Sequence, residues 1–468
     1  MPGFAYQWLD RSPELLRLSQ RLPEKFPYLL ESVAQGHLGS SSLLLYASGE
    51  ALVLHPDSGL SGPGKGKSFF ARLESWYQQE RAKPANDDLH EPARFPFIGG
   101  WFIYLGYETA REIERTLVLP VNRTGLPDAI AHRCHGAIMV IHGGPEESGD
   151  RAVAIAESDE LLAEMMSFME KVPEPENARD DTSAGQLARL EEEDPERFRE
   201  SVSRIHEYLL AGDVLQVNVS RPWTGEYQSA IEPDEIYRAL RKHNPAPFAG
   251  KMHWQDYVMV SSSPERLVQI EGRRIQTRPI AGTRPRGLNE KHDRDLSAEL
   301  IGNIKERAEH IMLIDMERND LGRVCKPGTV EVDELMVVES YAHVHHIVSN
   351  VRGELQPDAS PVDAIMAVFP GGTITGCPKV RCMEIIAELE MEGRGYYTGS
   401  MGYLGRNGSM DLNILIRTML IRGKHFSFRT GAGIVADSVA EDEVTETRDK
   451  ARGMLLAVGQ HGVESGNA

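Results

Sequence analysis

The chain has 468 residues, of which 41% are hydrophobic and 26% are charged, values that are ordinary for globular proteins and exclude a fibrous, disordered or membrane-spanning class. Its formal net charge of -19, without a Lys/Arg-rich stripe, argues against nucleic-acid binding. The four cysteines form no CxxC pair and no leader or membrane segment is visible, so we expect a cytoplasmic protein that does not enter a membrane.

The N-terminal region, residues 1–172, is predicted to be β-rich. Its short apolar stretches, such as 42–46 and 152–156, are separated by turn residues, which is typical of sheet. Residues 173–192 begin with an acidic, proline-punctuated segment with too few apolar side chains to pack, so we predict a linker there. The remaining region, 193–460, is the predicted catalytic domain.

The C-terminal region alternates between helix and strand patterns. Apolar residues recur at helical spacing from Phe198 to Leu209, and Gly212 then ends the pattern, which predicts a helix over 195–211. Further strands and one long helix are predicted over 214–219, 257–260, 330–338 and, for the helix, 296–313. The fold class is therefore mixed α/β, of the α+β type, with a mainly antiparallel sheet.

Three glutamates are candidate metal ligands. Glu309 lies in the predicted long helix, while Glu443 and Glu446 are three residues apart and would share one face of a helix. Carboxylate oxygens in such a pairing suit Mg²⁺, which takes few protein ligands. A solvated acidic helix face would show the same spacing, so both interpretations stay open.

Several other residues could contact an anionic substrate. Glycines such as Gly282, Gly431 and Gly433 let main-chain amides approach a carboxylate, although ordinary turns need glycine as well. Arg417, within a predicted apolar strand, needs a carboxylate from the protein or from a ligand. Glu265 is a candidate acid/base group or a structural residue.

Hydrolase and nucleotide-binding motifs are missing from the sequence. The chain contains neither Gly-x-Gly-x-x-Gly nor the Walker pattern nor Gly-x-Ser-x-Gly. Cys134 lacks the glycine-flanked elbow of a glutaminase nucleophile. We therefore expect no glutamine-hydrolysing site in this chain.

Taken together, seven segments resemble the chorismate-utilising enzyme family and stand in the family's order. The resemblance is strong over about 195–456 and weaker over 29–32 and 97–107. The segments that carry it are 212–218, 263–266, 278–283, 306–310, 315–322, 369–379 and 431–438.

The resemblance implies that large antiparallel sheets pack as a sandwich with surrounding helices, around a site that binds chorismate. It implies that Mg²⁺ is held by Glu309, Glu443 and Glu446, and that Glu265 protonates the departing 4-hydroxyl. Other catalytic positions that the resemblance implies are Gln216, His346 and Thr373. The substrate-binding positions that it implies are Gly282, Thr283, Lys379, Tyr403, Arg417, Gly431 and Gly433.

The nucleophile and the product follow from comparison with the family's branches. Isochorismate and salicylate synthases place a water-activating lysine where this chain has Gln216, so the resemblance implies ammonia, supplied by a partner glutamine amidotransferase. Gly372 and the segment 97–107 look like the aminodeoxychorismate branch of folate synthesis, whereas Ala281 is typical of anthranilate synthases. We predict 4-amino-4-deoxychorismate as product; the alternatives are anthranilate plus pyruvate, or a catalytically silent amino-acid-binding regulator.

A second ligand region is also suggested by the resemblance. Glu31 and Ser32, together with Pro247 and Phe248, match the tryptophan-binding region of the family. Bound tryptophan is thus one interpretation, and a packed structural turn is the other.

Overall fold

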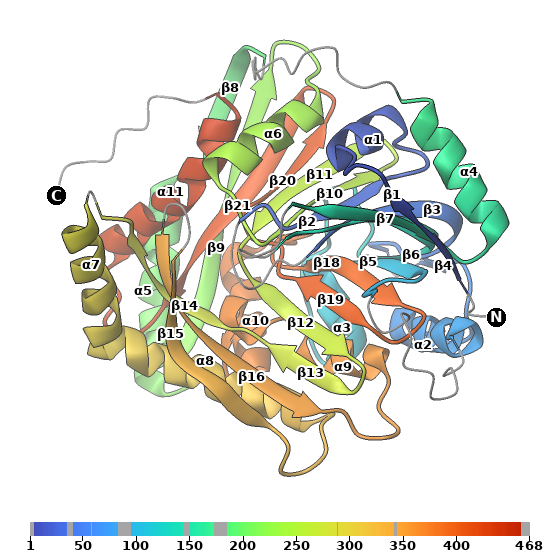
Figure 1. The fold of residues 1–468 in the computed structure, drawn as a ribbon. Helices are drawn as coiled ribbons and strands as arrows, with labels where there is room; N and C mark the ends of the chain where they lie inside the picture. The colour runs from blue at the N-terminus through green and yellow to red at the C-terminus, as the bar shows by residue number, and fades with distance from the viewer. Residues whose placement is uncertain are drawn as a thin grey trace.

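The computed structural model describes residues 4–34, 41–57, 59–82, 95–143, 149–172, 185–287, 289–340 and 344–459. All strand pairs within these ranges are antiparallel, as the sequence predicted. Figure 1 shows the sheet bent around the centre of the molecule, with helices on its outer faces.

The strands of the N-terminal region are β1 (Ala5–Leu9), β2 (Tyr28–Glu31), β3 (Ser41–Leu54), β4 (Leu60–Ser61), β5 (Gly100–Leu105), β6 (Ala129–Ile141) and β7 (Arg151–Ala156). Those that follow are β8 (Leu187–Glu192), β9 (Gln216–Tyr227), β10 (Phe248–Trp254), β11 (Tyr257–Ser263), β12 (Arg266–Glu271), β13 (Arg274–Thr277) and β14 (Ile280–Pro285). The last are β15 (Glu331–Ser340), β16 (Val344–Glu354), β17 (Gly376–Cys377), β18 (Ser400–Gly405), β19 (Met410–Asn413), β20 (Thr418–Arg422) and β21 (His425–Ile434).

The first α-helices are α1 (Leu15–Arg21), α2 (Phe69–Glu80), α3 (Ala110–Ile113), α4 (Asp159–Glu170), α5 (Pro195–Ala211) and α6 (Pro233–His243). The others are α7 (Glu290–Gly302), α8 (Ile304–Gly322), α9 (Pro361–Val368), α10 (Lys379–Glu390) and α11 (Ala440–Ala457). Two single 3₁₀ turns matter for the site, η2 (Tyr107–Thr109) and η3 (Gly372–Ile374).

The sheet has two halves that are joined through the N-terminal region. One half runs β8-β9-β21-β20-β11-β10 and continues into β2 and β3. The other runs β15-β16-β13-β12-β19-β18 and continues into β5. Because β6 pairs with both β3 and β5, it closes the connection between the halves.

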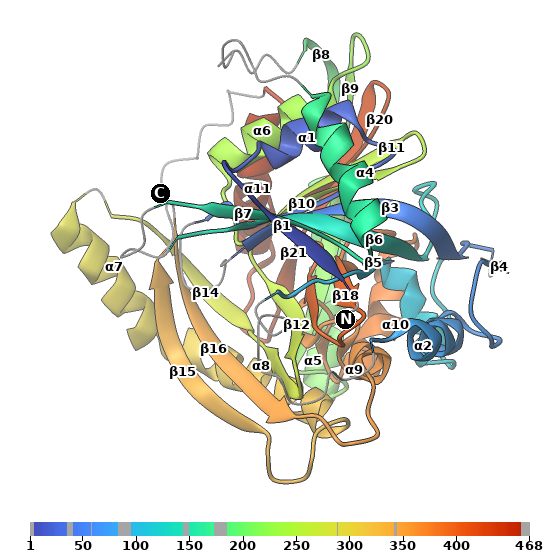
Figure 2. The same cartoon turned by 45° about the vertical axis from the view of Figure 1, so that its right-hand side comes forward.

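A shared core lies between the two halves and bears out the predicted sandwich. Met252 and Met259 of the first half pack in one buried cluster with Met401 and Tyr403 of β18 in the second. The turned view in Figure 2 separates the upper strands β1, β7 and β10 from the lower strands β14, β15 and β16. The predicted fold class is therefore confirmed.

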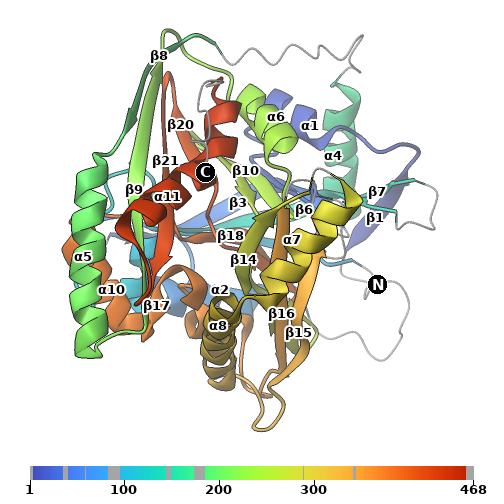
Figure 3. The ribbon, with the colours of Figure 1, turned by 90° about the vertical axis from the view of Figure 1, so that its left-hand side faces the viewer.

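Helices cover the outer faces of this sheet. In Figure 3, α5 and α11 lie against β9 and β21, and α7 and α8 lie beside β14 and β16. The start of α5 follows from its sequence, because Asp194 accepts a hydrogen bond from the Glu196 amide and Pro195 opens the helix. Gly212 ends it in the left-handed conformation, as predicted.

The predicted long helix over 296–313 is wrong, since two helices meet there. Asn303 interrupts the pattern with an extended backbone, and its side chain accepts a hydrogen bond from the Glu306 amide at 3.2 Å. A side chain that caps a new first turn favours a break over one continuous helix.

Residues 173–184, the first part of the predicted linker, lie outside the described residues. Residues 187–192, the end of the predicted linker, form β8, which pairs with β9. The division of the chain into two domains on either side of the linker stays a prediction. No helix among the described residues is long and apolar enough to span a bilayer.

Candidate active site

The candidate site lies where the chain crosses from one half of the sheet to the other. Glu265 lies in the crossover from β11 to β12, and Arg417 lies in the crossover from β19 to β20. The two crossovers are joined by a hydrogen bond from the Ile414 amide to the Glu265 carbonyl, at 3.0 Å. Strand pairing on both sides therefore fixes the position of both side chains.

The Glu265 carboxyl is buried and is an acid near neutral pH. Loss of solvation by burial raises its pKa to about 7, while the Thr373 hydroxyl, the Ile280 main chain, Lys450 and Arg417 partly offset the rise. The Thr373 hydroxyl therefore lies beside the Glu265 carboxyl, although no hydrogen bond of standard geometry joins Thr373 Oγ1 to a partner among the described residues.

Arg417 was predicted within a strand, which is wrong, because β20 begins only at Thr418. Its backbone adopts φ 51°, and its carbonyl accepts a hydrogen bond from the Ser262 amide at 3.0 Å. Its guanidinium donates to Asn244 Oδ1 at 3.3 Å, and no carboxylate within the described ranges pairs with it. Burial lowers the pKa of Arg417 and Glu265 partly offsets that, which leaves a cation suited to a substrate carboxylate.

His346, on β16, is held neutral in the same region. Burial, reinforced by Arg417, lowers its pKa to about 3, so the imidazole is uncharged at neutral pH. Its Nδ1 lies 3.4 Å from the Gly282 carbonyl oxygen. Thr283 pairs with His346 through the main chain, but the Thr283 side chain lies outside the described residues.

The other end of the site is formed by the β9–β21 pair. Gly433 lies opposite Asn218, and a Cβ on Gly433 would meet Gln216 Nε2 at 2.2 Å. The Gln216 side chain therefore lies against the glycine, and its buried Oε1 has no hydrogen-bond partner in the described part of the chain. Lys450 of α11 donates to the Gly431 carbonyl at 3.0 Å, which brings a cation to this end.

Two predicted substrate contacts lie away from this constellation. Tyr403 packs edge-on against Phe97 at 5.7 Å between ring centroids, in the core between the two halves. Tyr397 lies at the site instead, since a Cβ on Gly431 would meet its hydroxyl at 2.7 Å. Lys379 donates to Asp320 at 2.5 Å and to the Val368 carbonyl at 3.1 Å, which ties its ammonium to the protein.

The three predicted metal ligands are not assembled into a cluster. Glu309 is half-buried on α8, Glu443 is buried on α11, and Glu446 pairs with Lys450 at 2.6 Å. Across the described ranges, no group of three or more His, Cys, Asp or Glu side chains could hold a metal ion. The carboxylate donors suit Mg²⁺ chemically, and Mg²⁺ stays a prediction.

The four residues predicted to bind tryptophan come from neighbouring strands. Glu31 lies opposite Ala249 in the β2–β10 pair and accepts a hydrogen bond from the Tyr237 hydroxyl at 2.8 Å. The Ser32 amide donates to Ser42 Oγ at 3.2 Å. Phe248, next to buried Pro247, lies opposite Ser263, so this region adjoins the crossover that carries Glu265.

Sequence reasoning missed Tyr397 and Lys450. Lys450 lies four residues after Glu446, so helical spacing alone would have placed it on the same face as the glutamates. Tyr397 had a weaker signal, a pair of tyrosines between Gly395 and Gly399. Glycines beside an aromatic residue indicate close backbone approach, but they do not say to which strand.

A buried carboxylic acid and a buried guanidinium without an ion-pair partner among the described residues lie at two neighbouring crossovers. This combination is typical of an enzyme site that binds a small carboxylate. The profile of the family described as chorismate binding enzyme matches residues 33–456. The chain therefore belongs to the chorismate-binding enzyme family and is an enzyme.

Individual relatives carry the names of two activities. An anthranilate synthase component I-like protein of Synechocystis is 41% identical over 90% of this chain and 87% of its own length. The aminodeoxychorismate synthase component 1 of Bacillus subtilis is 40% identical over 93% of this chain and 92% of its own. The crystal structure of anthranilate synthase component I from Streptococcus pneumoniae superposes with a TM-score of 0.76, at 29% identity over 90% of this chain and 93% of that one.

Proposed function

We propose that this enzyme aminates chorismate with ammonia to give 4-amino-4-deoxychorismate. The observation that carries the proposal is Gln216, a neutral side chain whose buried carbonyl oxygen has no hydrogen-bond partner among the described residues. Such an oxygen accepts a hydrogen bond from ammonia, whereas an amide cannot take the proton that activation of water requires.

Glu265 is the proposed general acid for the departing 4-hydroxyl. A C–N bond forms to ammonia as the C–O bond breaks, and the Glu265 proton converts the leaving hydroxide into water. The nitrogen then loses a proton, which restores the acid. With a pKa of about 7, the carboxyl is protonated in a large fraction of molecules at neutral pH, as this step requires.

The substrate carboxylates call for cations and main-chain donors. Arg417 is the proposed partner of one carboxylate, because no carboxylate among the described residues forms an ion pair with its guanidinium. Tyr397 and Lys450 converge on Gly431 and would complete this clamp. Mg²⁺ bound by Glu309, Glu443 and Glu446 is proposed as the cofactor; such an ion would supply positive charge to a second carboxylate.

Ammonia is proposed to come from a separate glutamine amidotransferase subunit. A glutaminase of the cysteine type needs a reactive thiolate. Burial instead raises the pKa of the Cys134 thiol to about 12 and that of Cys325 to about 11, and it also raises the pKa of Cys377 and Cys382. None of the four cysteines of this chain is therefore activated.

Anthranilate is the second candidate product. Ala281, on β14, offers no amine for a covalent adduct with the ring, and relatives named for anthranilate synthesis are about as similar as the aminodeoxychorismate synthase. Direct attack by ammonia is compatible with either product. What separates them is the ring carbon that ammonia attacks. Attack that leaves nitrogen at C4 gives 4-amino-4-deoxychorismate, whereas anthranilate needs nitrogen at C2, next to the ring carboxylate, followed by elimination of pyruvate.

Product analysis tests the proposal. The purified chain is incubated with chorismate, ammonium and Mg²⁺, and products are separated by chromatography with mass detection. We expect 4-amino-4-deoxychorismate without pyruvate. Fluorescent anthranilate with equimolar pyruvate, formed without a second enzyme, would establish the alternative, and isochorismate would overturn the assignment of Gln216.

A further inference from the structure

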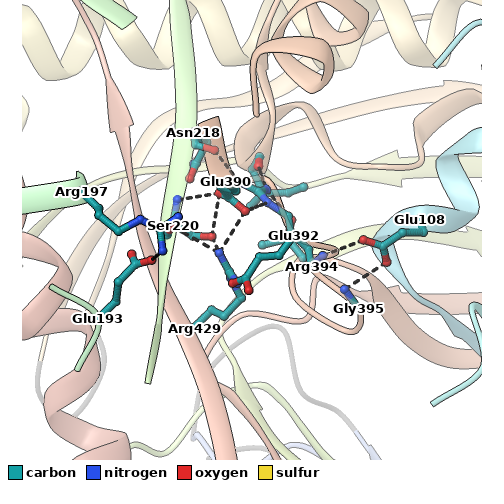
Figure 4. A network of polar contacts seen from close by, with 12 residues as sticks. Glu108, Glu193, Arg197, Asn218, Ser220, Glu390, Glu392, Arg394, Gly395 and Arg429 are labelled. Atoms are coloured by element: carbon teal, nitrogen blue, oxygen red, sulfur yellow. Dashed lines mark hydrogen bonds and ion pairs between the residues drawn. The ribbon is translucent and has the colours of Figure 1, made fainter. Parts of the chain in front are cut away.

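The turn that carries Tyr397 is docked on the N-terminal region. Glu108 of η2 accepts hydrogen bonds from the main-chain amides of Arg394 at 2.6 Å and Gly395 at 3.0 Å, one on each carboxylate oxygen (Figure 4). The Tyr107 amide donates to the Gly395 carbonyl at 2.7 Å. Three main-chain groups of the turn are thus fixed by two consecutive residues from the segment 97–108.

The Arg394 side chain extends this connection into the site. Its guanidinium carbon lies 4.8 Å from the ring centroid of Tyr107 and 5.6 Å from that of Tyr397, so the cation lies against both rings. Its Nη2 donates to the Asn218 carbonyl at 2.7 Å, and Asn218 in turn donates from its side chain to the Thr373 carbonyl at 3.1 Å.

A buried counter-charge keeps that guanidinium in one orientation. Glu390 pairs with Arg394 at 2.6 Å and with Arg429 at 3.0 Å, and it accepts hydrogen bonds from the amide and hydroxyl of Ser220. Figure 4 shows these groups converging between β9 and the turn. These contacts fix the Arg394 side chain. The main chain of the turn is held separately, by the hydrogen bonds that its amides donate to Glu108.

We propose that Glu108 is a positioning residue for chorismate, holding the 394–398 turn so that the Tyr397 hydroxyl lies at Gly431. The inference rests on the proposed function for its substrate and assigns to the N-terminal region a part in substrate binding. Glu108 is almost completely buried, at 1% exposure. The Glu108 carboxyl contacts main-chain amides of the turn. Its effect on substrate binding would therefore be transmitted through the turn.

The test is the variant Glu108→Gln, whose amide nitrogen cannot accept a hydrogen bond, so one of the two main-chain contacts is lost. We expect the KM for chorismate, with ammonium as amine donor, to rise at least about tenfold while kcat changes less than about threefold, as for lost substrate positioning. Glu108→Asp, with its carboxylate withdrawn by one methylene, is the second variant and should raise KM likewise.

The matched control is Glu112→Gln in the neighbouring helix α3. Glu112 also accepts a main-chain hydrogen bond, from the Phe69 amide at 2.6 Å, but it serves α2 rather than the turn. We expect this variant to leave KM within about twofold of wild type. An equal rise in KM in both variants would overturn the inference, because it would show a general effect of weakened packing.

A double variant shows whether Glu108 acts through Tyr397. If it does, adding Glu108→Gln to Tyr397→Phe changes KM by less than about twofold beyond Tyr397→Phe alone, whereas independent effects multiply. Calorimetric binding of chorismate is measured in parallel. A wild-type chain that binds chorismate without aminating it refutes the proposed function only, while unchanged KM and dissociation constant in both Glu108 variants refute the inference.

Discussion

At the scale of single residues, the chemistry depends on the protonation of Glu265. Its pKa of about 7 makes the required acid form lose population as the pH rises. We expect kcat/KM for chorismate to be steady below pH 6 and to fall about tenfold for each unit above pH 8, when measured at constant ionic strength. Glu265→Gln should lower the rate by about 10²–10⁴-fold at pH 7.

The raised pKa of Glu265 also predicts how the stability of Glu265→Gln, relative to wild type, depends on pH. The Glu265 pKa is raised from 4.5 to about 7 by folding, so its contribution to stability is present below pH 4.5 and is lost as the pH rises through 7. The loss is about 3 kcal/mol. The free energy of unfolding of Glu265→Gln relative to wild type should rise by that amount between pH 4.5 and pH 8 in urea titrations; a constant difference would contradict the raised pKa.

Gly433 controls the position of Gln216. In Gly433→Ala the new Cβ would meet Gln216 Nε2 at 2.2 Å, and the amide, as the end of a flexible side chain, must move away. We expect kcat/KM to fall at least about tenfold while the melting temperature stays within about 3 °C. Gly322→Ala is the control, because its Cβ would meet no atom within 4 Å, and it should leave both quantities unchanged.

Several of the predicted site residues come from short sequence motifs. The structure brings Glu265, Thr373 and His346 into one region around Arg417, while Gln216 lies against Gly433 on the β9–β21 pair. The resemblance implied Tyr403, and Tyr397 was not among the predicted residues, although both tyrosines have glycine neighbours in the sequence. Only the long-range approach of Tyr397 to Gly431 separates them, and no local pattern encodes that distance.

At the scale of elements, α9 leads into the loop that carries Thr373. The N-terminus of α9 has a capping box, formed by Ser360 and Asp363. Ser360 Oγ accepts from the Asp363 amide at 3.1 Å and donates to Glu74 at 2.6 Å, while Asp363 accepts from the Ser360 amide. Ser360→Ala should reduce the free energy of unfolding by about 1–2 kcal/mol in urea titrations. Ser201→Ala is the control, because Ser201 lies within α5 and its hydroxyl donates to the Arg197 carbonyl of the same helix, at 2.9 Å. It should cost less than about 0.5 kcal/mol, and an equal cost would contradict the capping role.

Helices α8 and α11 carry the three glutamates that are proposed to bind Mg²⁺, and metal-binding measurements test that proposal. We expect EDTA to abolish turnover and added Mg²⁺ to restore it. Glu309→Gln should weaken Mg²⁺ binding at least about tenfold in calorimetry, because one carboxylate ligand is lost. Glu299→Gln is the control, since Glu299 is exposed and pairs with Arg284 at 3.1 Å. Unchanged Mg²⁺ affinity in Glu309→Gln would remove this residue from the site.

At the scale of the whole molecule, the strand order explains what the sequence could and could not predict. Helix and strand periodicities located β9, β11, β15 and α5, because burial on one face leaves a local pattern. The closure of the sheet through the N-terminal region depends on pairings such as Ser400 with Leu105, which are far apart in the chain. The regions on either side of the predicted linker contribute strands to one sheet.

This sharing predicts one cooperative unfolding transition. If residues 4–172 unfolded alone, β10 would lose β2 and β18 would lose β5, leaving two apolar edges unpaired. Hydrogen exchange with mass detection should therefore be measured at increasing urea concentrations. The urea midpoints for peptides from β3 and from β10 should agree within about 0.3 M. Gly250→Val, whose Cβ would meet the Leu29 carbonyl at 2.7 Å, should lower both midpoints together. Earlier exchange in β3 alone would show that the N-terminal region unfolds independently.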